Sequence, residues 1–232
     1  MKLIARIDSS PSATGGTDAA GAFLAWPDSC MLISHRPLYI PESNEGFMAV
    51  PALAFRIKHL GKGITPKFAL RYIGDYSAAL ILMPASALRR LRLDGMPLPG
   101  ELCFDNALVV GQWQEISFPS RPLQEAEARE AMRVSLPETF LISMRKLGSD
   151  KASDIQCSRV PVDAGDLPSF LARVSETNTL KTGDVLLLPA IGAAFPARCD
   201  TLLSICAECR PDSITPTGEE LPENLLLSTK FK

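Results

Sequence analysis

The side chains in this sequence that could most directly bind a metal or act in catalysis are six cysteines and two histidines. Cys206 and Cys209, in the stretch CAEC, have the C-x-x-C spacing that zinc sites and redox-active thiol pairs use. The sequence supplies no second pair and no nearby histidine that would complete a set of zinc ligands. We therefore interpret the cysteines as structural or incidental thiols, with metal or redox chemistry as the alternative. The role of Cys206 and Cys209 stays open at this point.

A nucleophilic site would need a serine or cysteine beside a general base, and His35 and His59 are the histidine bases of the chain. In the stretch SHRP, around His35, the Arg36 guanidinium could bind an acidic ligand; exposure on the surface is the competing interpretation. The stretch HLGKG, residues 59–63, loosely resembles a phosphate-binding loop but lacks the full G-x-x-x-x-G-K-[ST] spacing. We interpret Cys103 as a small buried residue and not as a reactive thiol.

Length, composition and charge favour a soluble globular protein. The 232 residues are enough for one large domain or two small ones. With 46% hydrophobic and 22% charged residues, the chain can bury a sizeable core. Its net charge of −2 gives no global positive field, so we expect no nucleic-acid partner and no membrane partner. Because no apolar run is long enough for a signal peptide or a membrane span, we expect a cytoplasmic protein.

The pattern of apolar residues predicts many short strands and a few helices. Nineteen prolines and fifteen glycines interrupt the chain, which favours strands and turns over long helices. Strands are predicted at 1–7, 30–34, 51–57, 76–82, 107–113, 138–147, 184–189, 200–209 and 225–231. Helices are predicted at 66–73, with Thr65 as N-cap and Pro66 as the first helical residue, at 86–93, and from 166 to an end within 175–178. The segment 121–132 is predicted to be an exposed helix or an extended turn. Such a mixture argues for an α+β fold.

One of these helix–turn–strand units carries a resemblance. The segment LPSFLARVSETNTLKTGDVLLL, residues 167–188, resembles the C-terminal signature of the fumarylacetoacetate hydrolase superfamily, a helix, a Ser…Thr-Leu-x-x-Gly-Asp turn and an apolar strand. The matching residues are Ser175, Thr179, Leu180, Gly183 and Asp184. Three earlier segments resemble family segments in the same order and spacing: AVPALAFRI, ITPKFALRYIGDYSAALIL and GELCFDNALVVGQW. Together they cover roughly residues 26–206.

The resemblance implies a fold and an assembly. It implies a β-rich α+β fold in which mixed and antiparallel sheets form a rolled, partly open barrel with a few helices. We expect one such domain over residues 1–232, with an N-terminal strand and flexible loop in 1–25 and a C-terminal extension in 211–232. Members of the family tend to form dimers, so a homodimer is implied by resemblance alone.

The resemblance also implies a metal site, from which this sequence departs. Active members hold Mg²⁺ or Mn²⁺ with two glutamates of a Glu-x-Glu strand and the aspartate of an Asn-Asp pair, and they act on dicarbonyl acids. The glutamate positions correspond to Val50 and Ala52, and the aspartate position to Ile81. A substrate-facing lysine corresponds to Leu102. Since aliphatic side chains cannot ligate a hard cation, we expect no metal cofactor at these positions.

Two further pocket positions are replaced in the same direction, from polar to apolar. The threonines of the family's Thr-Gly-Thr stretch correspond to Leu188 and Ala190. A shift of the alignment by one or two residues could bring Asp75, Asp94 or Glu101 nearer the site, but no nearby shift restores Glu-x-Glu.

Three hypotheses about function follow. The leading one is a divergent member without the metal-dependent C–C hydrolase, decarboxylase or isomerase activity, with a role in partner or dimer interaction. The second is an active hydrolase or lyase with a relocated, metal-independent site that uses His35, Arg36 or a cysteine. The third is a small-molecule binding module. Clustering of His35 and Arg36 in a pocket would favour the second, and an open cavity beside Val50 and Ile81 would favour the third.

Overall fold

The structure is a computed structural model that describes the chain apart from residues 8–21, 34, 43–44, 94–98, 149–153 and 209–223. The loop predicted after the first strand lies outside the described residues, as do Asp94 and Cys209. Within the described part, the strands form two sheets of nine and five strands.

The larger sheet is built around two long strands, β5 (Phe47–Ile57) and β6 (Ile73–Pro84), which pair antiparallel over most of their length. Its main order is β2-β1-β11-β5-β6-β7-β3, with β12 on β5 and β8 on β6. The other strands of this sheet are β1 (Lys2–Arg6), β2 (Phe23–Pro27), β3 (Met31–Ile33), β7 (Leu108–Val110), β8 (Gln114–Glu115), β11 (Val185–Pro189) and β12 (Phe195–Ala197).

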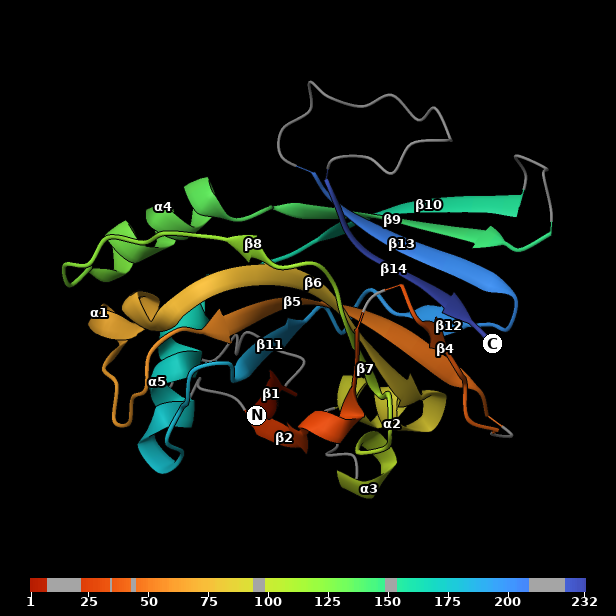
Figure 1. Cartoon of the computed structure of the whole chain (residues 1–232), viewed down its shortest axis with the longest axis horizontal. Coiled ribbons are helices and arrows are strands. Elements are labelled where there is room, and N and C mark those ends of the chain that lie inside the picture. Colours follow the sequence, from red (N-terminus) through yellow and green to blue (C-terminus); the bar gives the residue numbers. More distant parts are fainter. Residues whose placement is uncertain (8–21, 34, 43–44, 94–98, 149–153, 209–223) are drawn as a thin grey trace.

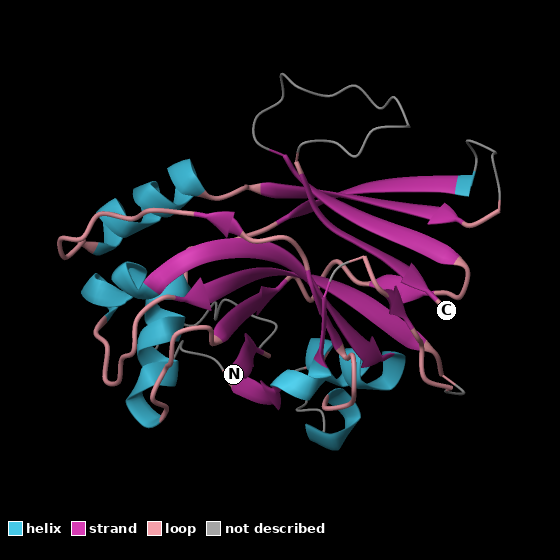
Figure 2. Cartoon of the chain, in the orientation of Figure 1, coloured by secondary structure: helices cyan, strands magenta, loops and turns pink. Residues whose placement is uncertain are grey.

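The smaller sheet lies across one face of the larger one (Figures 1 and 2). Its order is β10-β9-β13-β14-β4. These strands are β4 (Pro37–Leu38), β9 (Thr139–Lys146), β10 (Ile155–Pro161), β13 (Thr201–Glu208) and β14 (Leu225–Phe231). The last predicted strand, at 225–231, is therefore confirmed, and it lies inside this sheet between β13 and β4.

The helices gather at two ends of the larger sheet (Figure 1). Near one end lie α1 (Pro66–Ala69), the 3-10 turn η2 (Leu70–Tyr72), α4 (Glu125–Ser135) and α5 (Leu167–Thr177). Near the other lie α2 (Ala85–Arg92), α3 (Pro99–Leu102) and the 3-10 turn η1 (Asp28–Cys30). No helix in the described part of the chain is long and apolar enough to span a membrane.

The alternation of side chains along β5 divides the core into two clusters. Val50, Ala52 and Ala54 face one cluster together with α2 and α3. Leu53 and Phe55 face the other, which also contains side chains of the smaller sheet. Strands buried on both faces have mostly apolar sequences, as β5 and β6 do apart from the partly buried pair Arg56 and Asp75. The expected β-rich α+β fold with a curled, partly open barrel is confirmed.

Several elements differ from the sequence prediction, which did not include β2, β4, β8, β12 or α3. The helix predicted to begin at Pro66 is shorter than expected, because Pro66–Ala69 gives way to the 3-10 turn at Leu70 and Ile73 already belongs to β6. Strand β10 was not predicted, since its side chains are mostly exposed and polar and give no apolar pattern.

Candidate functional site

The Gly-Asp turn of the signature connects β1, the segment after α5 and the start of β11 through hydrogen bonds. The Asp184 side chain is 2% exposed. One carboxylate oxygen accepts the backbone N–H of Lys2 (2.8 Å) and the other accepts the backbone N–H of Lys181 (2.9 Å). The Lys2 ammonium lies 3.5 Å from the same carboxylate and donates to the carbonyl of Thr179. Asp184 thus fixes β1 beside β11 and takes no part in any cavity described here.

Ser175 has a comparable role on α5. Its side chain is fully buried, and its hydroxyl oxygen accepts the backbone N–H of Ile64 (2.9 Å). The hydroxyl donates to the carbonyl of Ala172 (2.8 Å). Gly183 adopts φ +91°, where a residue with a side chain would be strained, so the backbone conformation of the turn explains the glycine at this position. The matching signature residues therefore hold the backbone together.

The structure brings four of the six expected pocket positions together. Val50 pairs directly with Ile81 in the β5–β6 ladder, and Ala52 lies two residues further along the same face. Leu102, at the end of α3, belongs to the same buried cluster. The exposed fraction is 0% for Val50 and Ala52 and 1% for Ile81 and Leu102. The four side chains form part of a continuous aliphatic core.

Leu188 and Ala190 do not join this cluster. Leu188 is buried in the cluster on the opposite face of the sheet, and Ala190 packs against that same cluster. Successive side chains of a strand alternate between faces, so Leu187 faces the cluster of Val50 where Leu188 cannot. The resemblance carried no information about which face of the sheet each of these side chains would occupy.

The acidic residues considered as substitutes are paired elsewhere. The Asp75 carboxylate lies 2.8 Å from the Arg56 guanidinium, and Glu101 pairs with Arg90. Among the residues that the structure describes, no group of three histidine, cysteine, aspartate or glutamate side chains is placed to hold a metal ion.

His35 and Arg36 lie in the exposed turn before β4. The backbone N–H of His35 donates to Ser228 (2.7 Å), and the carbonyl of Arg36 accepts the Thr229 hydroxyl (3.0 Å). The His35 ring lies 3.3 Å from the Gln112 amide nitrogen. The turn is anchored to β14 through its backbone, which agrees with surface placement.

The thiols of the described cysteines lie on different elements. Burial raises the pKa of the Cys103 and Cys206 thiols, and burial followed by the neighbouring Cys103 raises that of Cys30. A raised pKa disfavours the thiolate, which is the nucleophilic form. Cys103, Cys206, His35 and Arg36 are all absent from the lining of the hollow beside β9 and of the cavity beside α1.

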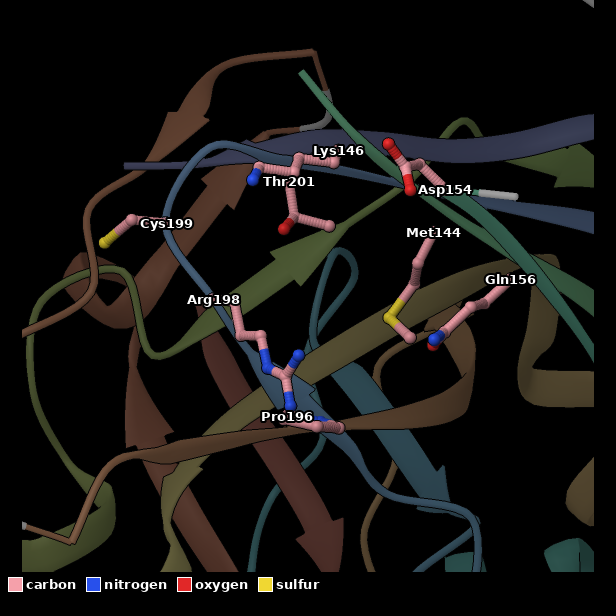
Figure 3. A pocket seen from close by; sticks show the side chains of 8 residues that line it. All are labelled: Met144, Lys146, Asp154, Gln156, Pro196, Arg198, Cys199 and Thr201. Carbon is pink, nitrogen blue, oxygen red and sulfur yellow. The ribbon is translucent and has the colours of Figure 1, made fainter. Parts of the chain in front are cut away.

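A hollow of about 460 Å³ opens between the smaller sheet and the link from β12 to β13. Lys146 comes from β9, Asp154 and Gln156 come from the residue before β10 and from β10 itself, Arg198 comes from the link, and Thr201 is the first residue of β13. Figure 3 shows the Arg198 side chain reaching toward Pro196, while the Cys199 thiol points away from the other side chains. Sequence reasoning missed this hollow because its residues come from separate segments whose proximity depends on strand pairing.

Comparison with solved structures identifies the fold. A protein from Yersinia pestis CO92 assigned to the fumarylacetoacetate hydrolase family superposes with a TM-score of 0.65 at 15% identity, over 100% of this chain and 93% of that one. The 5-carboxymethyl-2-hydroxymuconate delta-isomerase of Mycobacterium smegmatis gives 0.63 at 16%, over 99% and 76%. The fumarylpyruvate hydrolase of Pseudomonas aeruginosa, in complex with Mn²⁺ and pyruvate, gives 0.61 at 14%, over 99% and 88%.

Sequence comparisons add nothing to this result, since no protein-family model and no curated protein matches the chain. The structural similarity extends over essentially the whole chain at identities below 20%. This chain therefore has the fold of the fumarylacetoacetate hydrolase family structures.

Proposed function

We propose that this protein is a divergent relative of the fumarylacetoacetate hydrolase superfamily that lacks the family's metal-dependent C–C hydrolase, decarboxylase or isomerase activity on dicarbonyl acids. The single observation that carries the proposal is the joint burial of Val50, Ala52 and Ile81 in one aliphatic cluster. These are the positions that correspond to the three metal-binding carboxylates of the family pattern.

The residues present do not fit Mg²⁺ or Mn²⁺. Both ions take oxygen ligands, and Val50, Ala52 and Ile81 offer none. Burying a carboxylate without a partner costs several kcal/mol, whereas burying a large aliphatic side chain contributes about 1.5–3 kcal/mol. Once a metal is no longer bound, aliphatic residues at these positions stabilise the fold better than carboxylates.

The proposed role is non-catalytic, in partner or dimer interaction. A homodimer and a cytoplasmic location remain part of this proposal. The alternative of a relocated site is less favoured, since His35 and Arg36 are exposed and the cysteines lie on other elements.

The test combines activity with metal rescue. We expect the wild-type protein with Mn²⁺ to leave the ultraviolet absorbance of the acylpyruvate acetylpyruvate unchanged beyond the rate in buffer. We expect the triple variant V50E/A52E/I81D to be strongly destabilised without metal, because three carboxylates enter the core. Mn²⁺ should raise its unfolding temperature if these positions correspond to the family ligands.

The matched control is V50Q/A52Q/I81N, which introduces similar volume and polarity without charge. It should be destabilised and should gain nothing from Mn²⁺. Turnover of acetylpyruvate by the wild-type protein that depends on Mn²⁺ would contradict the loss of activity. Equal responses of the two triple variants to Mn²⁺ would contradict the assignment of the positions.

A further inference from the structure

A second cavity, of about 550 Å³, is lined by residues of the loop after β5, of α1 and of η2. Its apolar wall contains Ile64, Phe68, Tyr72 and Phe118. Its polar wall contains Lys58, His59, Lys62 and Arg71. None of the lining residues that the structure describes is acidic. The volume falls within the roughly 300–1,000 Å³ of small-molecule sites.

The loop that forms the rim is held at several points. Gly61 exchanges two backbone hydrogen bonds with Leu180, of 3.0 and 2.8 Å, and the backbone N–H of Gly63 donates to Ser175 (2.8 Å). The backbone N–H of Lys58 donates to Tyr72 (2.8 Å). A side chain at Gly61 would lie 2.5 Å from the Tyr72 ring, so glycine lets the ring pack on the loop. The rim is pre-organised, which lowers the entropy cost of binding.

The backbone hydrogen bonds of Gly61 and Gly63 determine which groups of the loop could bind an anion. In a phosphate-binding loop, glycine-rich backbone N–H groups point at the ligand. Here the N–H of Gly61 already donates to the carbonyl of Leu180, and the N–H of Gly63 donates to the carbonyl of Ser175 in α5. The resemblance of HLGKG to a phosphate loop therefore does not extend to its backbone. Recognition falls to the side chains.

The cationic side chains at the cavity have no carboxylate partner in the described part of the chain. Eight other arginines form ion pairs, for example Arg6 with Asp166 and Arg159 with Glu208. Lys58, Lys62 and Arg71 form none among the described residues. The Arg71 guanidinium instead lies 5.5 Å from the centre of the Phe68 ring. Stacking of this kind orients a guanidinium while leaving its N–H donors free to bind a ligand.

We propose that this cavity binds a small organic anion, a carboxylate or phosphate group joined to an apolar or aromatic body. Lys58, Lys62 and Arg71 would hold the anionic group, and Phe68, Tyr72 and Phe118 would contact the apolar body. The His59 ring, edge-on to the Tyr72 ring at 6.4 Å, adds a further polar group at the rim. This site is separate from the cluster around Val50, so it does not depend on the fate of the metal positions.

Calorimetry with four small probes tests the chemistry. Phenyl phosphate and phenylacetate carry both an anion and a ring, benzyl alcohol carries the ring alone, and inorganic phosphate carries the anion alone. We expect both aromatic anions to bind more tightly than benzyl alcohol or inorganic phosphate. Preference for phenyl phosphate over phenylacetate would identify the natural ligand as a phosphate ester, and the reverse as a carboxylic acid.

Two exposed cations provide the variants. Arg71→Gln and Lys62→Gln should each weaken binding of the preferred aromatic anion by about ten- to a hundredfold, as expected for the loss of a charged hydrogen-bond donor. The matched control is Arg89→Gln, an exposed arginine on α2 that does not line the cavity, and it should bind like wild type. Ser120→Trp, which places a large ring at the cavity, should abolish binding while leaving the unfolding temperature unchanged.

Three results would overturn the proposal. One is equal affinity for benzyl alcohol and phenylacetate, which would mean that charge plays no part. Another is equal affinity of Arg71→Gln and Arg89→Gln for the aromatic anions. The third is binding to anionic phospholipid vesicles without binding to any soluble probe, since Leu60 is 68% exposed beside these cations and a membrane surface would then be the partner.

Discussion

At the scale of single residues, matches to and departures from the family pattern fall into two physical groups. The matching residues Ser175, Gly183 and Asp184 all have backbone roles in this structure. The departing residues Val50 and Ile81 are apolar and buried. In this structure the matching residues thus support the backbone, while these two departing residues belong to the apolar core.

Asp184 offers a direct test of this structural role. Asp184→Ala removes the acceptor of two backbone N–H groups, those of Lys2 and Lys181, in a buried place. We expect the free energy of unfolding, measured in urea, to fall by about 2–5 kcal/mol, because each unsatisfied buried donor costs about 1–3 kcal/mol. Asp184→Asn keeps one acceptor and should cost less.

Asp28→Ala is the control, since its carboxylate is 64% exposed and lies 3.8 Å from the chain's amino terminus. It should change stability by less than about 0.5 kcal/mol. A similar small effect for Asp184→Ala would mean that the signature aspartate is not a structural joint.

The sequence predicts which strand each candidate site residue lies on, but it does not predict which face of the sheet each side chain occupies. The grouping of Val50, Ala52 and Ile81 was predictable, because two of them lie two apart on one strand and the third lies on the strand expected beside it. The position of Leu188 on the opposite face was not, since a one-residue difference in register reverses the face. The cationic cavity was signalled only by HLGKG, and its aromatic wall depends on tertiary packing.

At the scale of elements, strands with long apolar runs were predicted from the sequence, and strands without such runs were not. β5, β6 and β11 are buried on both faces over most of their length, so each contains a long apolar run. β10 and β12 have exposed or small side chains and gave no signal. The helix α1 is shorter than its sequence pattern predicts, because Ile73 already belongs to β6 and pairs with Ile57 of β5. Strand pairing thus outweighs the local helical pattern.

The contact between β14 and the segment after β7 depends on a glycine. A methyl group at Gly111 would lie 2.1 Å from the carbonyl oxygen of Leu226, which belongs to the backbone of β14. The next residue, Gln112, donates its backbone N–H to the same carbonyl at 2.6 Å. The two sheets can approach this closely only because residue 111 has no side chain.

Gly111→Ala should therefore separate the sheets locally. We expect a loss of about 1–3 kcal/mol in unfolding free energy, typical of overpacking, with faster amide hydrogen exchange along β14. Gly192→Ala is the matched control, because a methyl group there meets nothing within 4 Å. Exchange along β14 that is unchanged in Gly111→Ala would contradict the close approach.

At the scale of the whole molecule, the two sheets share one core cluster. Leu53 and Phe55 of the larger sheet belong to the same cluster as Phe140 and Leu203 of the smaller sheet. Trp26 lies in the other cluster, on the far face of the larger sheet. A shared core of this size couples the sheets, so the molecule should unfold as one unit.

Phe140→Ala tests that coupling from the smaller sheet. Phe140 is fully buried, and its truncation should cost about 3–5 kcal/mol. If the sheets unfold together, the urea midpoint followed by the fluorescence of Trp26 and Trp113, which both lie at the cluster on the far face, should fall by the same amount as the midpoint followed by amide exchange in β13. Val134→Ala, at a position 76% exposed on α4, should move neither midpoint. A Phe140→Ala variant in which β13 exchanges early while the fluorescence transition stays at its wild-type midpoint would show that the smaller sheet opens separately. The loop at the cationic cavity is bonded to η2, to α5 and to Leu180 after α5, so the cavity should then keep its shape through that opening.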